Sequence, residues 1–413
     1  MPDARLKVCF ASILFYPVYA GAAIRFVRYA PLLASKGIDL TAFAGTPEGE
    51  LGLADASVSE QPGTFLPLVT VDGMAAQRVK LPLSGGFRRQ MTYLKALIAY
   101  CRHPSTRPDV IQAISVTNWW LLRYFSFRRL GIPVVYAYTL LGEMSGNPLK
   151  RGLQHLYWPL RFNMMDCIVV SSQLVRQRLL EFNVKTRIEV IPNGVDPDRF
   201  RPVESPEKKR DLRGALGLDP NGEFILYVGA LIKRKGIDRL LEAWKLIVRE
   251  RPSAYLLLVG PDERNVSGEQ ESANFSRYVE ETIRASGAGD RVILTGEVSD
   301  VQVYFQVADV FVFPSRREGM GNVVLEAFSS GLASVLTPYT GLPEELGTAG
   351  EHYVLADPSP QALSVEISRL LDDPARRGEL GRKSREWVEE NLTIGRSIDQ
   401  FAALYRDLAR KRK

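Results

Sequence analysis

Short apolar, β-branched runs recur along the chain, separated by longer stretches in which apolar residues have helical spacing. In the first half these runs begin at Leu6, Ile38, Asp109, Pro133, Cys167 and Ile188. In the second half they begin at Phe224, Ala254, Val292, Val310 and Ala333. Buried strands that alternate with helices are typical of parallel sheets covered by helices. The pattern predicts an α/β chain of two facing, doubly wound, Rossmann-like domains.

A stretch rich in charge and proline, DRFRPVESPEKKRDLRGALGLDPNGE, lies between the two series of runs. Its few large apolar residues are typical of a linker followed by a short helix. We place the boundary near Pro202, with an N-terminal domain over residues 1–202 and a C-terminal domain over 203–393. Helical periodicity at the end of the chain predicts that residues 394–413 form a helix that packs back on the N-terminal domain.

Composition narrows the class of protein. The 413 residues are 46% apolar and 24% charged, the balance of a soluble globular protein. No run approaches the ~20 apolar residues that a spanning helix needs. The early run VCFASILF resembles a secretory signal, but we expect it to form the first strand. Cys9, Cys101 and Cys167 are widely spaced and odd in number, which favours reduced thiols and a cytoplasmic protein.

Positive charge is concentrated in one part of the first half. Between Arg78 and Phe162 there are thirteen basic residues and two acidic ones, although the whole chain carries only +6. The segments GGFRRQMTYLKALIAY and NWWLLRYFSFRRLGI mix aromatic and basic side chains, a combination that suits an anionic lipid surface. The alternative that the Trp119 and Trp120 region belongs to the core stays open. No nucleic-acid-reading module accompanies the charge.

The segment SRREGMGNVVLEAFSSGLASVLT, from Ser315 to Thr337, carries the first candidate chemistry. It follows a strand that is expected to end at Pro314, and it predicts a turn that opens a helix through Ser330. The turn comprises Gly319, Met320, Gly321 and Asn322. The N–H groups and the dipole at such a helix start suit a pyrophosphate without a metal. Glu318 and Glu326 flank the turn, and carboxylates accept hydrogen bonds from sugar and ribose hydroxyls.

The segment YVGALIKRKGIDRLLEAW contains the second group of candidate site residues. Gly229 ends a strand, Gly236 opens a helix, and Lys235 lies at the mouth of the loop between them. An ammonium group there can neutralise a departing β-phosphate. Taken alone, Lys233, Arg234 and Lys235 could equally be a solvated loop.

The two segments, with TGEV at Thr295 between them, closely resemble the retaining glycosyltransferases of family 4, which have the GT-B fold. The resemblance covers nearly the whole chain. It includes EGMGNVVLE, GALIKRKG, IPNGVD at Ile191 and GLPEEL at Gly341, and more loosely YAGAAIRFVRYAPLLASKG from Tyr19.

The resemblance implies roles for individual residues. Glu326 would hold the donor ribose, Glu318 the transferred sugar and Lys235 the diphosphate, with Lys235 and Glu318 as the catalytic pair. The base would contact the backbone at Gly296, Glu297 and Val298, and Gly21 would lie against the sugar or phosphate. Further donor contacts are expected from Gly229, Arg234, Gly319, Met320, Gly321, Asn322 and Val323.

The chain departs from the family pattern at two positions. Ala230 stands where an arginine often follows the glycine of the phosphate loop, so Arg234 or Arg25 would supply the second positive charge. Thr139 stands where many members have a histidine. Arg25 and Thr139 are therefore the candidates on the acceptor side.

These patterns predict a retaining, metal-independent glycosyltransferase of the hexosyltransferase type (EC 2.4) that uses a UDP- or GDP-linked sugar and no cofactor. The expected acceptor is a lipid-linked or phosphorylated intermediate of cell-surface polysaccharide, with peripheral docking on the inner membrane face. A sugar-nucleotide epimerase of the same fold, or a non-catalytic nucleotide- or glycan-binding homologue, are the alternatives. Asp196 and Asp198 resemble a metal motif, but we interpret them as part of a proline-fixed turn.

Overall fold

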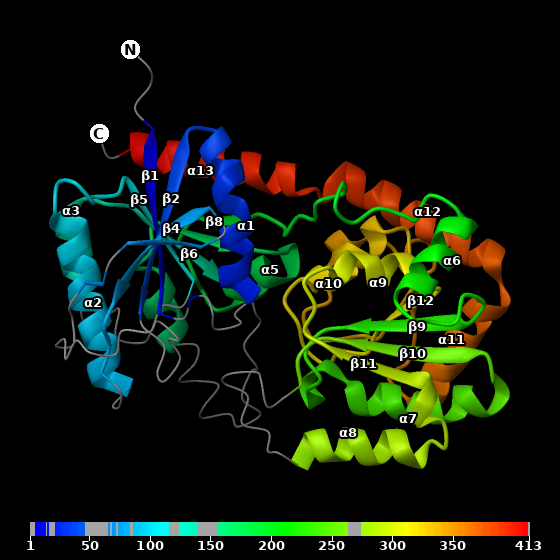
Figure 1. The fold of residues 1–413 in the computed structure, drawn as a ribbon. Helices are drawn as coiled ribbons and strands as arrows, with labels where there is room; N and C mark the ends of the chain where they lie inside the picture. Colours follow the sequence, from blue (N-terminus) through cyan, green and yellow to red (C-terminus); the bar gives the residue numbers. More distant parts are fainter. Residues whose placement is uncertain are drawn as a thin grey trace. The chain divides into compact units, whose positions relative to one another are not determined.

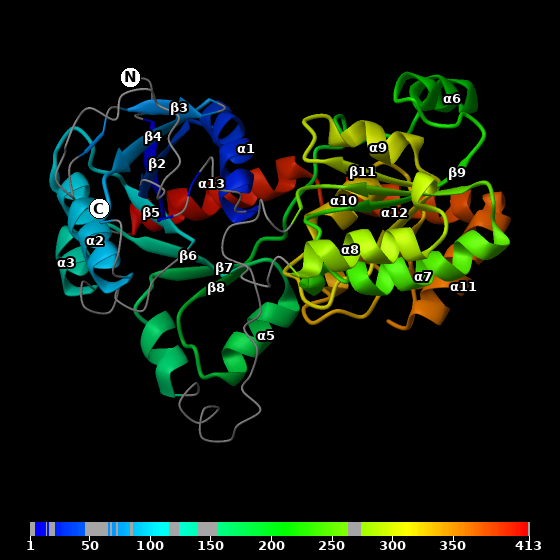
Figure 2. The ribbon, with the colours of Figure 1, turned by 60° about the horizontal axis from the view of Figure 1, so that its bottom comes forward.

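A computed structural model describes residues 5–13, 15, 21–45, 65–66, 68–71, 73–82, 86–114, 124–138, 156–262 and 274–411. The chain divides into two compact units (Figures 1 and 2). Unit 1 comprises Met1–Ile191 and Ile398–Lys413, and unit 2 comprises Pro192–Ser397. Two parallel-sheet α/β units confirm the predicted fold class.

The division between the units differs from the boundary that the sequence suggested. It falls after Ile191 rather than near Pro202. The reason is backbone pairing, because the Val195 N–H donates to the Leu392 carbonyl at 2.9 Å and the Val195 carbonyl accepts from the Ile394 N–H at 2.8 Å. The charged linker segment therefore belongs to unit 2 from its start.

Unit 1 is built on an eight-stranded sheet with the order β3-β4-β2-β1-β5-β6-β7-β8. All neighbours are parallel except β3 and β4. The strands are β1 (Leu6–Ser12), β2 (Ile38–Gly45), β3 (Val69–Val71), β4 (Met74–Val79), β5 (Val110–Ala113), β6 (Val134–Tyr138), β7 (Cys167–Val170) and β8 (Ile188–Val190). The helices named in the figures are α1 (Gly21–Ser35), α2 (Gly86–Arg102), α3 (Tyr124–Leu130), α5 (Gln173–Glu181) and α13 (Ile394–Arg410).

The last helix, α13, packs on unit 1 beside α1, as both views show (Figures 1 and 2). The Phe401 ring lies 5.5 Å from that of Phe26 on α1. The buried Tyr405 hydroxyl donates to Oε1 of Gln112 on β5 at 2.8 Å. Apolar burial and a satisfied buried hydrogen bond therefore hold the end of the chain on this sheet, as the helical periodicity of that segment predicted.

Unit 2 has a six-stranded parallel sheet with the order β11-β10-β9-β12-β13-β14. The strands are β9 (Glu223–Val228), β10 (Ala254–Val259), β11 (Val292–Gly296), β12 (Val310–Phe313), β13 (Ser334–Leu336) and β14 (Val354–Leu355). The helices are α6 (Pro206–Ala215), α7 (Ile237–Glu250), α8 (Asn274–Ala285), α9 (Val301–Val307), α10 (Asn322–Ser329), α11 (Pro360–Asp372) and α12 (Pro374–Asn391), with a 3₁₀ turn η2 at Lys233–Lys235.

Side-chain alternation along the strands gives unit 2 two apolar layers. Ile225 and Tyr227 of β9 face a layer formed with α7, α8 and α11. Phe224 and Leu226 face the opposite layer, formed with α9, α10 and α12. Both faces of the sheet are covered, as a doubly wound parallel sheet requires. The carboxyl ends of its strands are therefore where a ligand site is expected.

Glycines join three strands at this carboxyl edge. The Gly229 N–H donates to the Val259 carbonyl at 2.8 Å, and the Gly260 N–H donates to the Gly296 carbonyl at 2.9 Å. Gly260 has φ +141°, and a Cβ there would lie 2.2 Å from the Gly229 carbonyl oxygen. A side chain would force the edge apart, so glycine is required for this close approach.

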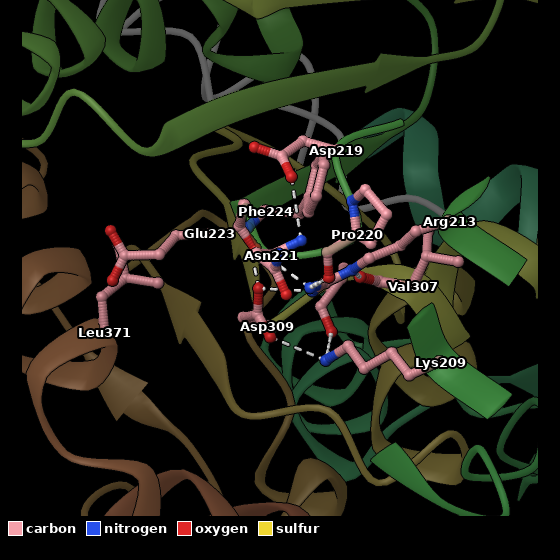
Figure 3. Close-up of polar contacts among 12 residues, drawn as sticks. Lys209, Arg213, Asp219, Pro220, Asn221, Glu223, Phe224, Val307, Asp309 and Leu371 are labelled. Carbon is pink, nitrogen blue, oxygen red and sulfur yellow. Dashed lines mark hydrogen bonds and ion pairs between the residues drawn. The ribbon is translucent and has the colours of Figure 1, made fainter. Parts of the chain in front are cut away.

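The amino ends of β9 and β12 are held by a partly buried polar cluster (Figure 3). Asp309 accepts from Lys209 Nζ, the Arg213 guanidinium and the Phe224 N–H, at 2.7, 2.7 and 2.8 Å. Arg213 also donates to three backbone carbonyls. Burial lowers the pKa of Lys209, and Asp309 opposes that shift. Because these charges are satisfied within the protein, we interpret the cluster as structural.

Candidate functional site

The candidate site begins where β12 ends, and it is shaped by backbone contacts. After Phe313 the chain passes through Pro314 and Ser315 into the glycine-rich turn, and α10 starts at Asn322, close to the predicted position. Ser315 is fully buried, and its carbonyl accepts from the Thr337 hydroxyl at 3.1 Å. The turn is thus held between β12 and the residues that follow β13.

Gly321 is the N-cap of α10. It adopts a left-handed conformation, with φ +70° and ψ +67°, and no side chain of the described residues caps the helix there. The Val324 N–H donates to the Gly321 carbonyl at 2.8 Å, whereas the N–H groups of Asn322 and Val323 donate to no backbone carbonyl of the described residues. N–H groups at a helix start carry its partial positive charge. The start of α10 can therefore bind an anion.

The predicted catalytic pair lies in direct contact. Glu318 Oε1 accepts from Lys235 Nζ at 2.7 Å, from Arg234 Nη1 at 3.2 Å and from the Ser315 hydroxyl at 2.8 Å. Glu318 is only 8% exposed. The fold brings one carboxylate and two cations, far apart in the sequence, to a single oxygen atom.

The loop that carries the two cations lies directly against the loop that carries Glu318. The Arg316 N–H donates to the Arg234 carbonyl at 3.0 Å, and the Arg316 guanidinium makes two bonds to Asp238, at 2.8 and 2.6 Å. Gly236 has φ +77°, and a Cβ there would lie 1.9 Å from the Pro314 carbonyl oxygen. The absence of a side chain at Gly236 allows the loops to meet.

Thr340 and Gly341, at the start of the segment GLPEEL, support Glu318 from its other side. The Glu318 N–H donates to the Thr340 carbonyl at 3.1 Å. Gly341 has φ +100°, and a Cβ there would lie 2.2 Å from the Glu318 carbonyl oxygen. The backbone of Glu318 is thus fixed on both sides by close contacts that depend on glycine.

Three other predicted donor residues lie on α10. Glu326 is 8% exposed, so its carboxylate is largely withdrawn from solvent. Asn322 accepts at 2.6 Å from the side-chain amide of Asn193, in the segment IPNGVD. Met320, in the turn before the helix, is buried. Val323 packs against the core but stays partly exposed.

The predicted base-contacting residues lie at the end of β11. Gly296 has φ +67°, Glu297 is exposed, and Val298 is partly buried against the core. In the strand order β11-β10-β9-β12, these residues share one sheet edge with Gly229 and Ser315.

The candidates from the first half of the chain belong to unit 1. Gly21 is the first residue of α1. Arg25 is 8% exposed, its guanidinium lies 5.1 Å from the Phe26 ring centre, and burial lowers its pKa. Thr139 lies outside the described residues. Of the two arginines considered as a second positive charge, Arg234 is the one that contacts Glu318.

The acidic residues of NGVDPDRF have a local backbone role. Asp196 Oδ1 accepts from the N–H groups of Asp198 and Arg199, at 3.0 and 3.2 Å. This pattern closes a turn. Across the part of the chain that the structure describes, no group of three or more acidic, histidine or cysteine side chains could hold a metal ion.

Sequence reasoning missed several members of the site. Ser315 contacts Glu318 within one loop, whereas Arg316 and Asn193 make contacts between separate loops. All three lie in segments that the sequence analysis singled out, but local sequence gives no signal of these contacts. Tyr339, which follows β13, lies with its ring edge-on to Phe313 at 5.5 Å. Its position two residues before GLPEEL was the one feature of the sequence that placed Tyr339 near the site.

The fold and the site define a two-domain α/β protein of the GT-B type. The family model "Glycosyl transferases group 1" matches residues 208–387, and "Glycosyltransferase Family 4" matches residues 19–199. Together they cover most of the chain, which belongs to the family 4 type of GT-B glycosyltransferases.

Curated relatives match a little over half of the chain. D-inositol 3-phosphate glycosyltransferase of Segniliparus rotundus is 29% identical over 64% of this chain and 58% of its own length. The lipopolysaccharide core biosynthesis mannosyltransferase LpsB of Rhizobium meliloti is 28% identical over 60% of this chain and 67% of its own. A GDP-mannose-dependent monoacylated alpha-(1-6)-phosphatidylinositol monomannoside mannosyltransferase of Corynebacterium glutamicum is 32% identical over 54% of this chain and 58% of its own length. The chain thus spans only about three fifths of these relatives.

Solved structures share the whole fold at low sequence identity. Sucrose-phosphate synthase from Thermosynechococcus elongatus has a TM-score of 0.77 at 23% identity, covering 98% of this chain and 100% of its own. Anabaena Alr3699/HepE in complex with UDP-glucose has a TM-score of 0.71 at 18% identity, covering 97% of this chain and 99% of its own. At these identities the likeness establishes the architecture.

The Gly236 contact gives a test of the site's construction. Gly236→Ala should lower the free energy of unfolding by more than about 2 kcal/mol, because the left-handed conformation costs ~1–2 kcal/mol and the clash with Pro314 adds to it. Gly217→Ala is the matched control, with φ +69° and nothing within 4 Å of the position that a Cβ would take. Urea unfolding measures both variants, and equal losses would contradict the proposed loop contact.

Proposed function

We propose that this chain is a retaining, metal-independent glycosyltransferase of the hexosyltransferase type (EC 2.4). Its donor is a UDP- or GDP-linked sugar. The observation that carries the proposal is the convergence of Lys235 and Arg234 on Glu318, at the start of a helix that no described side chain caps. Family membership supports the same reaction class.

The leaving group of such a reaction is a nucleoside diphosphate, whose negative charge grows as the bond to the sugar breaks. The N–H groups at the start of α10 meet part of that charge. The Lys235 ammonium and the Arg234 guanidinium meet the rest, in a partly buried site where electrostatic interactions are stronger than in water. These groups do what a divalent cation does in other sugar transferases.

The carboxylates orient the donor. Protein donors engage Oε1 of Glu318, so its second oxygen is the one proposed to accept from a hydroxyl of the transferred sugar. Glu326 accepts from the ribose hydroxyls, and the backbone at Gly296, Glu297 and Val298 contacts the base. The oxygen of the departing diphosphate takes the acceptor's proton on the same face of the sugar, which gives retention without a dedicated protein base.

The relatives support a narrower class of substrates. One is a lipopolysaccharide core mannosyltransferase, another acts on a phosphatidylinositol mannoside with GDP-mannose, and a structural neighbour was solved with UDP-glucose. We extend this to a lipid-linked or phosphorylated intermediate of cell-surface polysaccharide as acceptor.

Replacing Glu326 tests the donor site. Glu326→Ala should weaken calorimetric binding of the accepted nucleotide-sugar at least about tenfold, because hydrogen bonds to charged groups contribute ~1.5–3 kcal/mol. Glu351→Ala, which removes an exposed carboxylate of unit 2, is the control and should bind normally. Undiminished binding by Glu326→Ala would mean that the donor lies elsewhere.

Product analysis tests the reaction itself. With a nucleotide-sugar, an acceptor extract and EDTA, the protein should release nucleoside diphosphate and form an α-linked product from an α-linked donor. A sugar-nucleotide epimerase would convert the donor without acceptor, and a non-catalytic homologue would leave it unchanged. Turnover that stops in chelator and returns with Mn²⁺ would refute metal independence.

We also propose that unit 1 docks on an anionic membrane surface. Helix α2 has no acidic residue, and its first turn exposes Phe87 to 50% with Arg88 beside it. Apolar and basic side chains on one exposed turn suit the headgroup layer of an anionic bilayer. Within the described residues, no helix has the length and apolar character needed to cross a bilayer.

Liposome co-sedimentation tests this docking. The protein should bind vesicles containing phosphatidylglycerol at low salt, and Arg88→Glu should weaken binding by about thirtyfold, since each basic residue contributes ~1 kcal/mol and the reversal counts twice. Arg249→Glu, in the last turn of α7, is the control. Failure of the unaltered protein to bind at low salt would remove the idea.

A further inference from the structure

Tyr339 is a buried residue for which the proposed mechanism has no role. It follows β13 and is only 5% exposed, with its ring packed edge-on against Phe313. Its hydroxyl is enclosed, and among the residues that the structure describes it has no hydrogen-bond partner. Buried hydroxyls are nearly always paired, so this one calls for an explanation.

The hydroxyl lies at the start of α10. It is 3.4 Å from the position that a Cβ would take on Gly321, the N-cap of that helix. Burial, and to a lesser extent the charge of Glu318, raise the pKa of Tyr339 well above its usual value. The phenol therefore stays protonated and has one hydrogen to donate beside the N–H groups of α10.

The kind of acceptor follows from the surroundings. The start of α10, which no described side chain caps, favours an anion. The Glu318 carboxylate whose charge acts on Tyr339 is itself bonded to the Lys235 ammonium and the Arg234 guanidinium, which offset its negative charge. The hydroxyl lies against Gly321 of the glycine turn, so a ligand reaches it only if that turn moves.

We propose that Tyr339 is a further donor-binding residue, whose hydroxyl donates a hydrogen bond to the diphosphate of the nucleotide-sugar once the glycine turn has opened. This inference rests on the proposed function, and it assigns the phosphate contact to a side chain outside the two motifs identified in the sequence.

Tyr339→Phe tests the inference because it removes only the hydroxyl. Affinity for UDP or GDP, whichever the unaltered protein binds, should fall about tenfold to a hundredfold in calorimetry. Affinity for the matching UMP or GMP should change much less if the β-phosphate is the acceptor. The melting temperature of the free protein should not fall, because the lost hydroxyl had no partner.

Ser330→Ala is the matched control. Ser330 ends α10, and its buried hydroxyl likewise has no partner among the described residues. This variant should keep its nucleotide affinity. If Tyr339→Phe binds the diphosphate normally, loses monophosphate and diphosphate equally, or melts at a lower temperature, the inference is overturned. If the unaltered protein binds neither UDP nor GDP, the proposed function itself fails.

Discussion

The site depends on one carboxylate oxygen, Oε1 of Glu318, which accepts from Ser315, Arg234 and Lys235. Two cationic side chains in a partly buried site repel each other, and a carboxylate between them offsets that repulsion. The contact is possible only because two loops approach within backbone distance. Glycines at 236 and 341 allow that approach, since a Cβ at either position would overlap a carbonyl oxygen.

The sheets and the site's loops are predictable from sequence to different degrees. Parallel strands have strong apolar runs, and the runs at Leu6 and Phe224 became β1 and β9 at the expected places. The antiparallel pair β3 and β4 was missed because β3 has only three residues, none of them buried, and β4, MAAQRV, contains no continuous apolar run. Gly73 at their turn, with φ +79°, is nevertheless a typical hairpin signal.

The sequence was sufficient to select candidate site residues, but it was not sufficient to predict which of them contact each other. Glu318 and Lys235 were each expected to face a different part of a ligand, whereas the structure shows them bonded to each other. Such a pairing joins residues from separate loops and is set by the sheet register, on which local sequence carries little information. Arg25 shows the same limit, because its helix position did not reveal that it is buried against Phe26.

The ion pairs in the free protein bear on how a donor would be recognised. Lys235 and Arg234 are held in place before any ligand arrives, so less side-chain entropy is lost on binding than for two free, flexible cations. Two cations and one carboxylate leave a net charge of +1, to which the start of α10 adds its partial positive charge. A diphosphate would therefore still be attracted, while a neutral sugar would gain nothing from this charge. In the proposed enzyme, Glu318 would thus have two functions: it holds the cations in position, and it keeps one oxygen for the sugar that they help to release.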